Sequence, residues 1–411
     1  MASLRFSARQ WRIAGVATVV VLAVVLAVAW PVIRRVYVAA TLFDRGSIVS
    51  HFTHMAEIFP STPVPASTAP RRLPQGAPLV LPARFSAFGK NFALAQYLRD
   101  TGTDGLIVLQ DGNVVFEQYF QGNDAQTLHI SWSLAKSMIS AMLGMAVRDG
   151  AIHSVQDPVD RYVPALRGTA YEGVPLKAVM QMSSGVAFNE NYDDDNADVV
   201  RLARTLVLGG SFNAYAKKLR REFPPGTHRH YSSFDTQVLA MVLEGATGKR
   251  LPDYMRDKLW QPLGAEHEAR WLVDSTGMAM GFGGLNAVLR DYARFGQMYL
   301  DKGRVAGRQV VPGEWIRESL TMDAPQLLPQ AGQQNEHGIG YGYQWWIPED
   351  AQRDFMGIGV YNQFIYVAPS TRTVIVKQSA NYRYTSDDFV PIMEHLAMFR
   401  AIAAAASGGA R

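Results

Sequence analysis

The alternation of apolar and polar positions marks several elements of this chain before any single side chain is considered. Two apolar runs, 106–109 and 114–119, flank an Asp-Gly turn at 111–112, and together they predict an antiparallel β-hairpin over about 105–120. Ala, Met and Leu recur over 133–148, and Gly150 ends the run, which predicts a helix. A hairpin followed closely by a helix is therefore expected early in the folded part of the chain.

A long apolar stretch precedes these elements. Residues 13–33 are uncharged and rich in Val, Ala and Leu, and a helix of this length spans a bilayer at ~1.5 Å per residue. Basic residues on both sides favour a retained signal-anchor, with residues 1–12 in the cytoplasm and the rest outside it (the periplasm, in a bacterium). The alternative is a signal peptide cleaved near 27–29, which gives an exported soluble protein.

The next segment, residues 34–84, is predicted to be a linker, and its part over 58–84 either a linker or a segment that wraps the domain. Its proline density is high between Pro60 and Pro82, and proline prevents helix and central strand and favours extended chain. The folded domain is expected over 85–405, followed by a flexible tail, 406–411.

Composition narrows the function classes. A chain of 411 residues with 48% hydrophobic residues can bury a large core. The net charge of +4 comes from scattered basic residues, so no nucleic-acid partner is expected. The absence of cysteine excludes disulfides, thiolate metal sites and a cysteine nucleophile. The acidic segment 189–198 lacks the spacing of a calcium loop, so neither a metal nor another cofactor is expected, and the oligomeric state stays open.

The candidate chemistry begins at the head of the helix, with Ser133 and Lys136 in a Ser-x-x-Lys tetrad. Residues three apart share a helix face, so the lysine nitrogen lies beside a hydroxyl that needs a neighbouring base or a lowered pKa to attack a carbonyl. Ser131 and Ser137 lie close by, but neither has a lysine at this offset. It stays open whether Lys136 takes the proton itself or acts as a cation beside Tyr231, the second candidate base.

Further motifs follow in a consistent order, and together they resemble the serine β-lactamase-related superfamily (class C β-lactamase-like), nearest its 6-aminohexanoate-dimer hydrolase and family VIII esterase branch. The segments that carry the resemblance are the nucleophile segment 130–137, the Ser-Gly stretch 180–186, the Tyr-x-Ser element 231–233, the Gly-Gly turn 281–285, and the closing strands 357–377. The resemblance covers about residues 90 to 400.

This resemblance implies an α+β, β-lactamase/transpeptidase-like fold. An antiparallel sheet would combine the hairpin with strands near 341–347, 362–368 and 373–379, backed by a terminal helix over about 387–404. A mostly helical lobe, about 150 to 280, would be inserted between them, with the catalytic serine at the junction.

The resemblance also implies roles for individual residues. Tyr231 would relay the proton from Ser133 to the leaving group, and the backbone N–H groups of Ser133 and Val360 would form the oxyanion hole. Tyr231 lies between a Pro-Gly cluster and a helix, a loop position that suits a residue aimed into a cleft. Flanking histidines, His228 and His230, are less favoured because the family uses none.

Three residues are expected to contact substrate. They are Tyr192 in the acidic loop, Ser233 in the Tyr-x-Ser element, and Gly359 in the closing strands, where a glycine lets substrate lie against backbone. One aromatic ring of the Tyr343–Trp346 run is also expected to face the cleft.

Two departures from the penicillin-processing members affect the expected substrate. Gly357-Ile358-Gly359 stands where those members carry a basic triplet, and Ser233 replaces a common asparagine. Both favour hydrolysis of esters or linear amides. Together with the apolar stretch 13–33, they predict a membrane-anchored serine hydrolase that cleaves esters or small linear amides through an acyl-serine intermediate. The alternatives are a D,D-peptidase or β-lactamase acting on cell-wall peptides or β-lactams, and a non-catalytic binding protein on the same scaffold.

Overall fold

A seven-stranded antiparallel sheet forms the centre of this computed structural model, which describes residues 7–329, 339–348, 353–384 and 392–408. The strand order is β11-β12-β13-β14-β15-β4-β5, so the N-terminal hairpin pairs with the C-terminal strands. Its strands are β4 (Thr103–Gln110), β5 (Asn113–Tyr119), β11 (Gly340–Tyr341), β12 (Trp346–Ile347), β13 (Phe355–Gly359), β14 (Gln363–Ala368) and β15 (Thr373–Ser379).

The β4–β5 hairpin turns at Asp111 and Gly112, as the sequence predicts. Both residues have positive φ, 48° and 80°, the requirement of a type I′ turn, whose twist matches that of the paired strands. Gln110 pairs with Asn113 across it.

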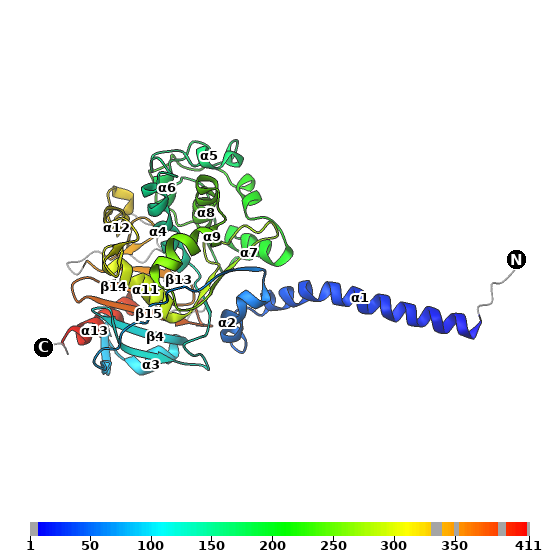
Figure 1. The fold of residues 1–411 in the computed structure, drawn as a ribbon, viewed down its shortest axis with the longest axis horizontal. Helices are drawn as coiled ribbons and strands as arrows, with labels where there is room; N and C mark the ends of the chain where they lie inside the picture. The colour runs from blue at the N-terminus through cyan, green and yellow to red at the C-terminus, as the bar shows by residue number, and fades with distance from the viewer. Residues whose placement is uncertain (1–6, 330–338, 349–352, 385–391, 409–411) are drawn as a thin grey trace.

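The two faces of the sheet belong to different layers, because successive strand residues point to opposite sides. In β4, Ile107 and Leu109 pack into the core shared with the helical lobe, whereas Leu106 and Val108 pack against the opposite layer. Helix α11 (Leu289–Leu300) covers the first face, and α13 (Ile392–Gly408) covers the second (Figure 1).

The helical lobe is built around α4 (Leu134–Arg148) and α8 (Ser233–Thr247), which pack together and are buried along most of their length. Gly248, with φ 65°, ends α8 in the left-handed conformation typical of helix C-termini. The other α-helices of the lobe and its surroundings are α3 (Leu94–Asp100), α5 (Val159–Tyr162), α6 (Leu176–Met180), α7 (Asp198–Leu208), α9 (Leu251–Met255), α10 (Gln261–Leu263) and α12 (Gly313–Ser319).

Short strands complete the molecule outside the central sheet. They are β1 (Ser61–Val64), β2 (Arg84–Ala87), β3 (Lys90–Ala93), β6 (His129–Ile130), β7 (Ala269–Leu272), β8 (Leu285–Ala287), β9 (Arg304–Val305) and β10 (Arg308–Gln309). The sheet β1-β7-β8-β6 matters for the site, because β6 leads directly into Ser131 and the start of α4.

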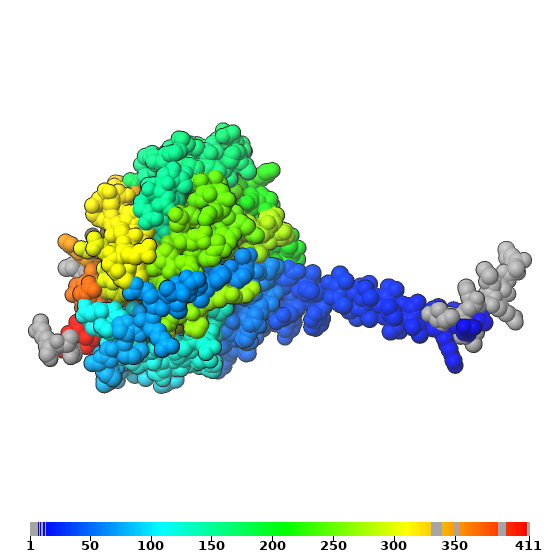
Figure 2. Space-filling model, viewed as in Figure 1, coloured from blue at the N-terminus to red at the C-terminus, as the bar shows by residue number. Residues whose placement is uncertain are grey.

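The N-terminal region combines a projecting helix with a packed segment. Helix α1 (Ala8–Ala40) extends away from the body as a long rod (Figures 1 and 2), and its stretch 14–40 is long and apolar enough to cross a membrane. Helix α2 (Ile48–Ile58) and β1 fall inside the expected linker 34–84, yet α2 packs on β6, β7 and β8 and β1 pairs with β7. This part of the chain therefore wraps the domain rather than standing apart from it.

Two further boundaries differ in detail from the sequence analysis. The expected strand 341–347 is divided into β11 and β12 by a turn in which Gln344 has φ 63°. Helix α13 runs on to Gly408, past its expected end near 404, and its expected start near 387 lies outside the described residues.

Candidate active site

Ser133 and Lys136 meet at the N-terminus of α4. Ser133 is the N-cap residue, and Lys136, one turn further on, directs its Nζ to 3.0 Å from the Ser133 Oγ. Their side chains are nearly buried, with 8% and 2% of their surface exposed. The neighbouring hydroxyls are engaged elsewhere, since Ser131 Oγ donates to the carbonyl of Trp132 and Ser137 Oγ donates to that of Gln344. The tetrad thus has the contact that its spacing predicts.

Lys136 reaches two further acceptors. Its Nζ lies 3.1 Å from the Oγ of Ser233 and 2.8 Å from the carbonyl oxygen of Phe282, in the predicted Gly-Gly turn. Burial lowers the pKa of Lys136 to about 8, and the nearby Glu190 carboxylate opposes this by favouring the charged form. A substantial share of the lysine is therefore neutral in mildly alkaline solution.

Glu190 fixes the direction of the Ser233 hydroxyl. Ser233 donates its Oγ proton to Glu190 Oε1 at 2.6 Å and its backbone N–H to Glu190 Oε2 at 2.8 Å, at the first turn of α8. A carboxylate at a helix N-terminus pairs with N–H groups that have no partner inside the helix. Because the Ser233 proton points to Glu190, a lone pair on its oxygen is left to accept from Lys136.

The tyrosines of the site lie around these groups. Tyr192 donates to Glu190 at 2.7 Å, and burial together with that carboxylate raises the pKa of Tyr192 well above its ordinary value. The ring of Tyr231 lies 5.2 Å from Lys136 Nζ, within cation–π range, and stacks on Trp346 at 5.5 Å. Trp346 is thus the ring of the 343–346 run that reaches the site.

The two histidines beside Tyr231 have contacts of their own. His230 lies 2.6 Å from the carbonyl of Phe188, and His228 stacks on Phe223 with its Nδ1 2.8 Å from the Thr227 hydroxyl. Neither contact involves Ser133 or Lys136.

Strand β13 closes the site on the side of the nucleophile. A Cβ on Gly359 would lie 2.8 Å from the carbonyl oxygen of Ser131, so only a glycine allows the strand to come this close to the start of α4. Val360 follows directly in the turn after the strand and is half-buried. Ser133, Lys136, Ser233, Tyr231 and Tyr192 therefore converge, with Gly359 and Val360 on the adjacent hairpin.

Comparisons with known proteins show the family of the chain. The Beta-lactamase family profile matches residues 93–392, which is most of the chain. The chain belongs to the Beta-lactamase family. It is 33% identical to the 6-aminohexanoate-dimer hydrolase of Paenarthrobacter ureafaciens over 294 residues, which cover 70% of this chain and 75% of that protein.

Solved structures support the same family. One from Bacillus anthracis, provisionally described as a 6-aminohexanoate-dimer hydrolase, superposes with a TM-score of 0.78 at 26% identity and covers 88% of this chain and 95% of its own. A penicillin-binding protein from Bacillus halodurans shares the fold, with a TM-score of 0.55 at 15% identity over 74% of this chain and 99% of its own. The protein is therefore a serine hydrolase of the amidase or esterase type on a β-lactamase/transpeptidase-like fold.

Two residues of the site could not be identified from the sequence alone. Glu190 lies in the acidic segment 189–198, and nothing in its local sequence distinguishes it from the other carboxylates there. The Phe282 acceptor is a backbone carbonyl, so the residue type carries no signal. Among the described residues, no group of three or more His, Asp or Glu side chains is placed to hold a metal ion.

Proposed function

We propose that this protein is a membrane-anchored serine hydrolase that cleaves esters or small linear amides through an acyl-serine intermediate. The observation that carries the proposal is the 3.0 Å contact between Lys136 Nζ and Ser133 Oγ, in a buried site where the lysine pKa falls to about 8. A neutral Lys136 has two N–H donors, which the oxygens of Ser233 and Phe282 accept, and one lone pair left for the Ser133 proton.

The proposed acylation step uses this geometry. Lys136 takes the proton as Ser133 Oγ attacks the carbonyl carbon, and the oxygen that becomes negative accepts from the backbone N–H groups of Ser133 and Val360. Tyr231, beside Lys136, gives its hydroxyl proton to the departing alcohol or amine as the bond to the acyl carbon breaks, and the proton that Lys136 took from Ser133 replaces it. Water then attacks the acyl-serine by the reverse route and releases the acid.

The substrate class rests on strand β13. Its residues, Phe355–Gly359, include no cation that could pair with the carboxylate of a β-lactam or a cell-wall peptide. A missing charge-assisted hydrogen bond costs ~1.5–3 kcal/mol, or about one to two decades in kcat/KM. Neutral esters and small amides do not need this hydrogen bond, so its absence does not lower their kcat/KM. The similarity to a 6-aminohexanoate-dimer hydrolase supports the amide part of the proposal.

The first test compares substrates and removes the nucleophile. We expect the full-length protein in detergent to hydrolyse p-nitrophenyl butyrate with a higher kcat/KM than nitrocefin, and to gain the mass of a fluorophosphonate probe. Ser133→Ala should lose both the activity and the labelling, because the Lys136 amine would have no hydroxyl to activate.

Tyr231→Phe should lower kcat by at least ~10²-fold, the usual scale of general acid–base help, and His230→Ala is its control.

Each contrary outcome would support a different function or a different nucleophile. A higher kcat/KM for nitrocefin would replace this proposal with the cell-wall hydrolase, and no turnover or labelling at all would support a binding protein on the same scaffold. Labelling that persists in Ser133→Ala would move the nucleophile to another serine.

A further inference from the structure

Two phenylalanines from the N-terminal region reach the catalytic end of α4. Phe43 lies in the loop after α1, and Phe52 lies in α2, where it is completely buried. We call Phe43 and Phe52 the N-terminal aromatic pair. They pack against two rings of the hydrolase domain, Trp132 and Tyr361.

Trp132 is the residue immediately before Ser133, and its backbone is strained. Its φ of 45° lies in the left-handed region, which is unfavourable for a bulky residue and persists only where the surroundings enforce it. The indole Nε1 is buried without a hydrogen-bond partner in the part of the chain that the structure describes. Packing therefore holds this ring, with Phe52 edge-on at 5.4 Å.

Tyr361 is the residue immediately after Val360, and its backbone is strained in the same way. Tyr361 and Asn362 have φ of 62° and 68°, in the turn between β13 and β14. The Tyr361 ring stacks on Phe43 at 4.5 Å and meets Phe52 edge-on at 5.3 Å. The N-terminal aromatic pair thus contacts the chain neighbour of each residue assigned to the oxyanion hole.

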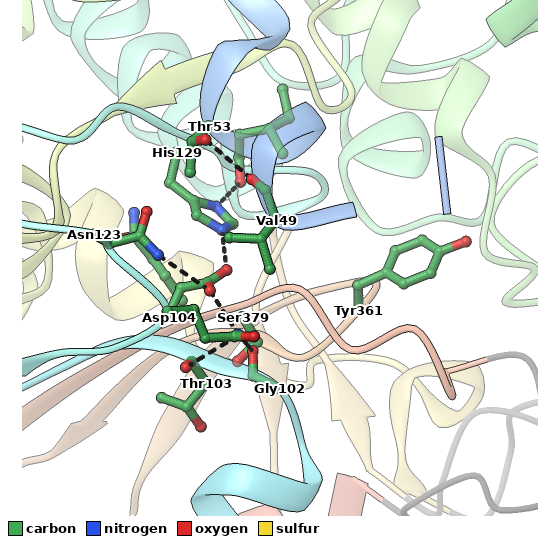
Figure 3. Close-up of polar contacts among 12 residues, drawn as sticks. Val49, Thr53, Gly102, Thr103, Asp104, Asn123, His129, Tyr361 and Ser379 are labelled. Atoms are coloured by element: carbon green, nitrogen blue, oxygen red, sulfur yellow. Dashed lines mark hydrogen bonds and ion pairs between the residues drawn. The ribbon is translucent and has the colours of Figure 1, made fainter. Parts of the chain in front are cut away.

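The pair has a rigid support behind it. Phe52 lies edge-on to His129 at 5.9 Å, and His129 Nε2 is 2.9 Å from the Asp104 carboxylate, with both side chains only 1% exposed. Figure 3 shows His129 between Asp104 and the residues Val49 and Thr53 of α2, with Tyr361 to one side. The Asp104–His129 pair fixes β6, the strand that leads into the nucleophile segment.

We propose that Phe43 and Phe52 are positioning residues of the active site: they hold Trp132 and Tyr361 so that the backbone N–H groups of Ser133 and Val360 face the same oxygen. This inference rests on the proposed acyl-transfer function. It makes the segment between the apolar helix and the domain a working part of the hydrolase, and a chain trimmed to residues 85–405 would lack that part.

The test measures how well the site stabilises an oxyanion. Full-length variants in detergent would be assayed with p-nitrophenyl butyrate and with the corresponding thionoester, whose sulfur accepts hydrogen bonds poorly and draws little benefit from an oxyanion hole. Loss of one oxyanion donor typically costs ~10²–10³ in kcat, so we expect a displaced donor in Phe43→Ala to cost about tenfold in kcat at little change in KM. The preference for the oxygen ester over the thionoester should fall several-fold.

Conservative and matched variants separate positioning from stability. Phe43→Trp keeps a stacking ring and should restore the rate, while Phe52→Leu should lower kcat and the ester preference together. Phe399→Leu, in the buried layer on the opposite face of the sheet, should reduce the melting temperature without changing that preference.

The decisive variant is Phe43→Ala, because that ring is 41% exposed and its loss leaves the core intact. Wild-type kcat and ester preference in Phe43→Ala would overturn the proposal. A Phe52→Leu defect that only tracks melting temperature, as in Phe399→Leu, would also overturn it. In either case, activity of the wild-type protein would still support the proposed hydrolase function.

Discussion

The chemistry at the scale of single residues depends on which way one hydroxyl points. Ser233 lies between Lys136 and Glu190, and it can accept from the lysine because its own proton goes to the carboxylate. Burial and the carboxylate act on Lys136 in opposite directions, and burial is the larger effect. The pKa of Lys136 consequently lies near the pH range in which a general base is most effective.

Glu190→Gln tests this balance. Removing the negative charge removes the effect that favours the ammonium, so the pKa of Lys136 should fall further below about 8. If neutral Lys136 is the base, kcat/KM rises as the pH rises through that pKa, and the acid limb of the profile should move to lower pH in the variant. Glu314→Gln, at an exposed position, is the control and should leave the limb unchanged. A limb that moves to higher pH would contradict the assignment of Lys136 as the base.

At the scale of elements, the site exists because strand β13 comes unusually close to the start of α4. Gly357 and Gly359 face that helix start at different distances. A Cβ at Gly359 would meet the Ser131 carbonyl oxygen at 2.8 Å, whereas one at Gly357 would meet side-chain atoms of Leu134 and Ser137 at 3.3 Å. A backbone atom cannot swing aside, but a side chain can.

Alanine scanning of the two glycines should therefore give unequal results. Gly359→Ala should push β13 and Val360 away from Ser133 and lower kcat/KM for p-nitrophenyl butyrate by at least about tenfold, since small displacements of catalytic groups are costly. Gly357→Ala should retain most of the activity. Equal rates in the two variants, at equal melting temperatures, would mean that the close approach is not needed for catalysis.

The elements also show what sequence reasoning can reach. The β4–β5 hairpin and α4 were predictable because their signals, an Asp-Gly turn and a helical apolar pattern, are local. The contact between Glu190 and Ser233 joins residues 43 positions apart, and that between Phe52 and Tyr361 joins residues far more distant. The sequence around Glu190 or Phe52 gives no sign of such a partner, so the resemblance to a family could suggest candidate catalytic groups but not the residues that support them.

At the scale of the whole molecule, helix α1 projects from the body with its apolar side chains exposed. Trp11 and Trp30 lie near the ends of an exposed Val- and Leu-rich stretch, where aromatic rings commonly mark the two membrane interfaces. None of the most apolar 18-residue window of this helix is buried in the protein. A bilayer would provide the apolar surroundings that the body does not.

Fractionation of cells that make the full-length chain tests the anchor. We expect the protein in the membrane pellet after carbonate and high-salt washes, with the catalytic domain open to protease from outside the cytoplasm. A variant with Val20→Arg and Val24→Arg should leave the pellet, because each charge in the middle of a span costs ~2.5–3.5 kcal/mol. A soluble mature form that begins near Trp30 would show a cleaved signal peptide instead.

The short connection between α1 and α2 has a consequence for reach. Residues 41–47 separate the two helices, and they are tied down by the Ser47 hydroxyl on the Thr41 carbonyl at 2.8 Å and by Phe43 on the domain. If residues 41–47 were not attached to the domain, they could extend by ~25 Å and allow the domain to move relative to the membrane. Because they are packed, they would hold the domain at one distance from the membrane. An anchored enzyme of this kind would sample a thin layer beside the bilayer, so molecules would have to enter that layer to be cut.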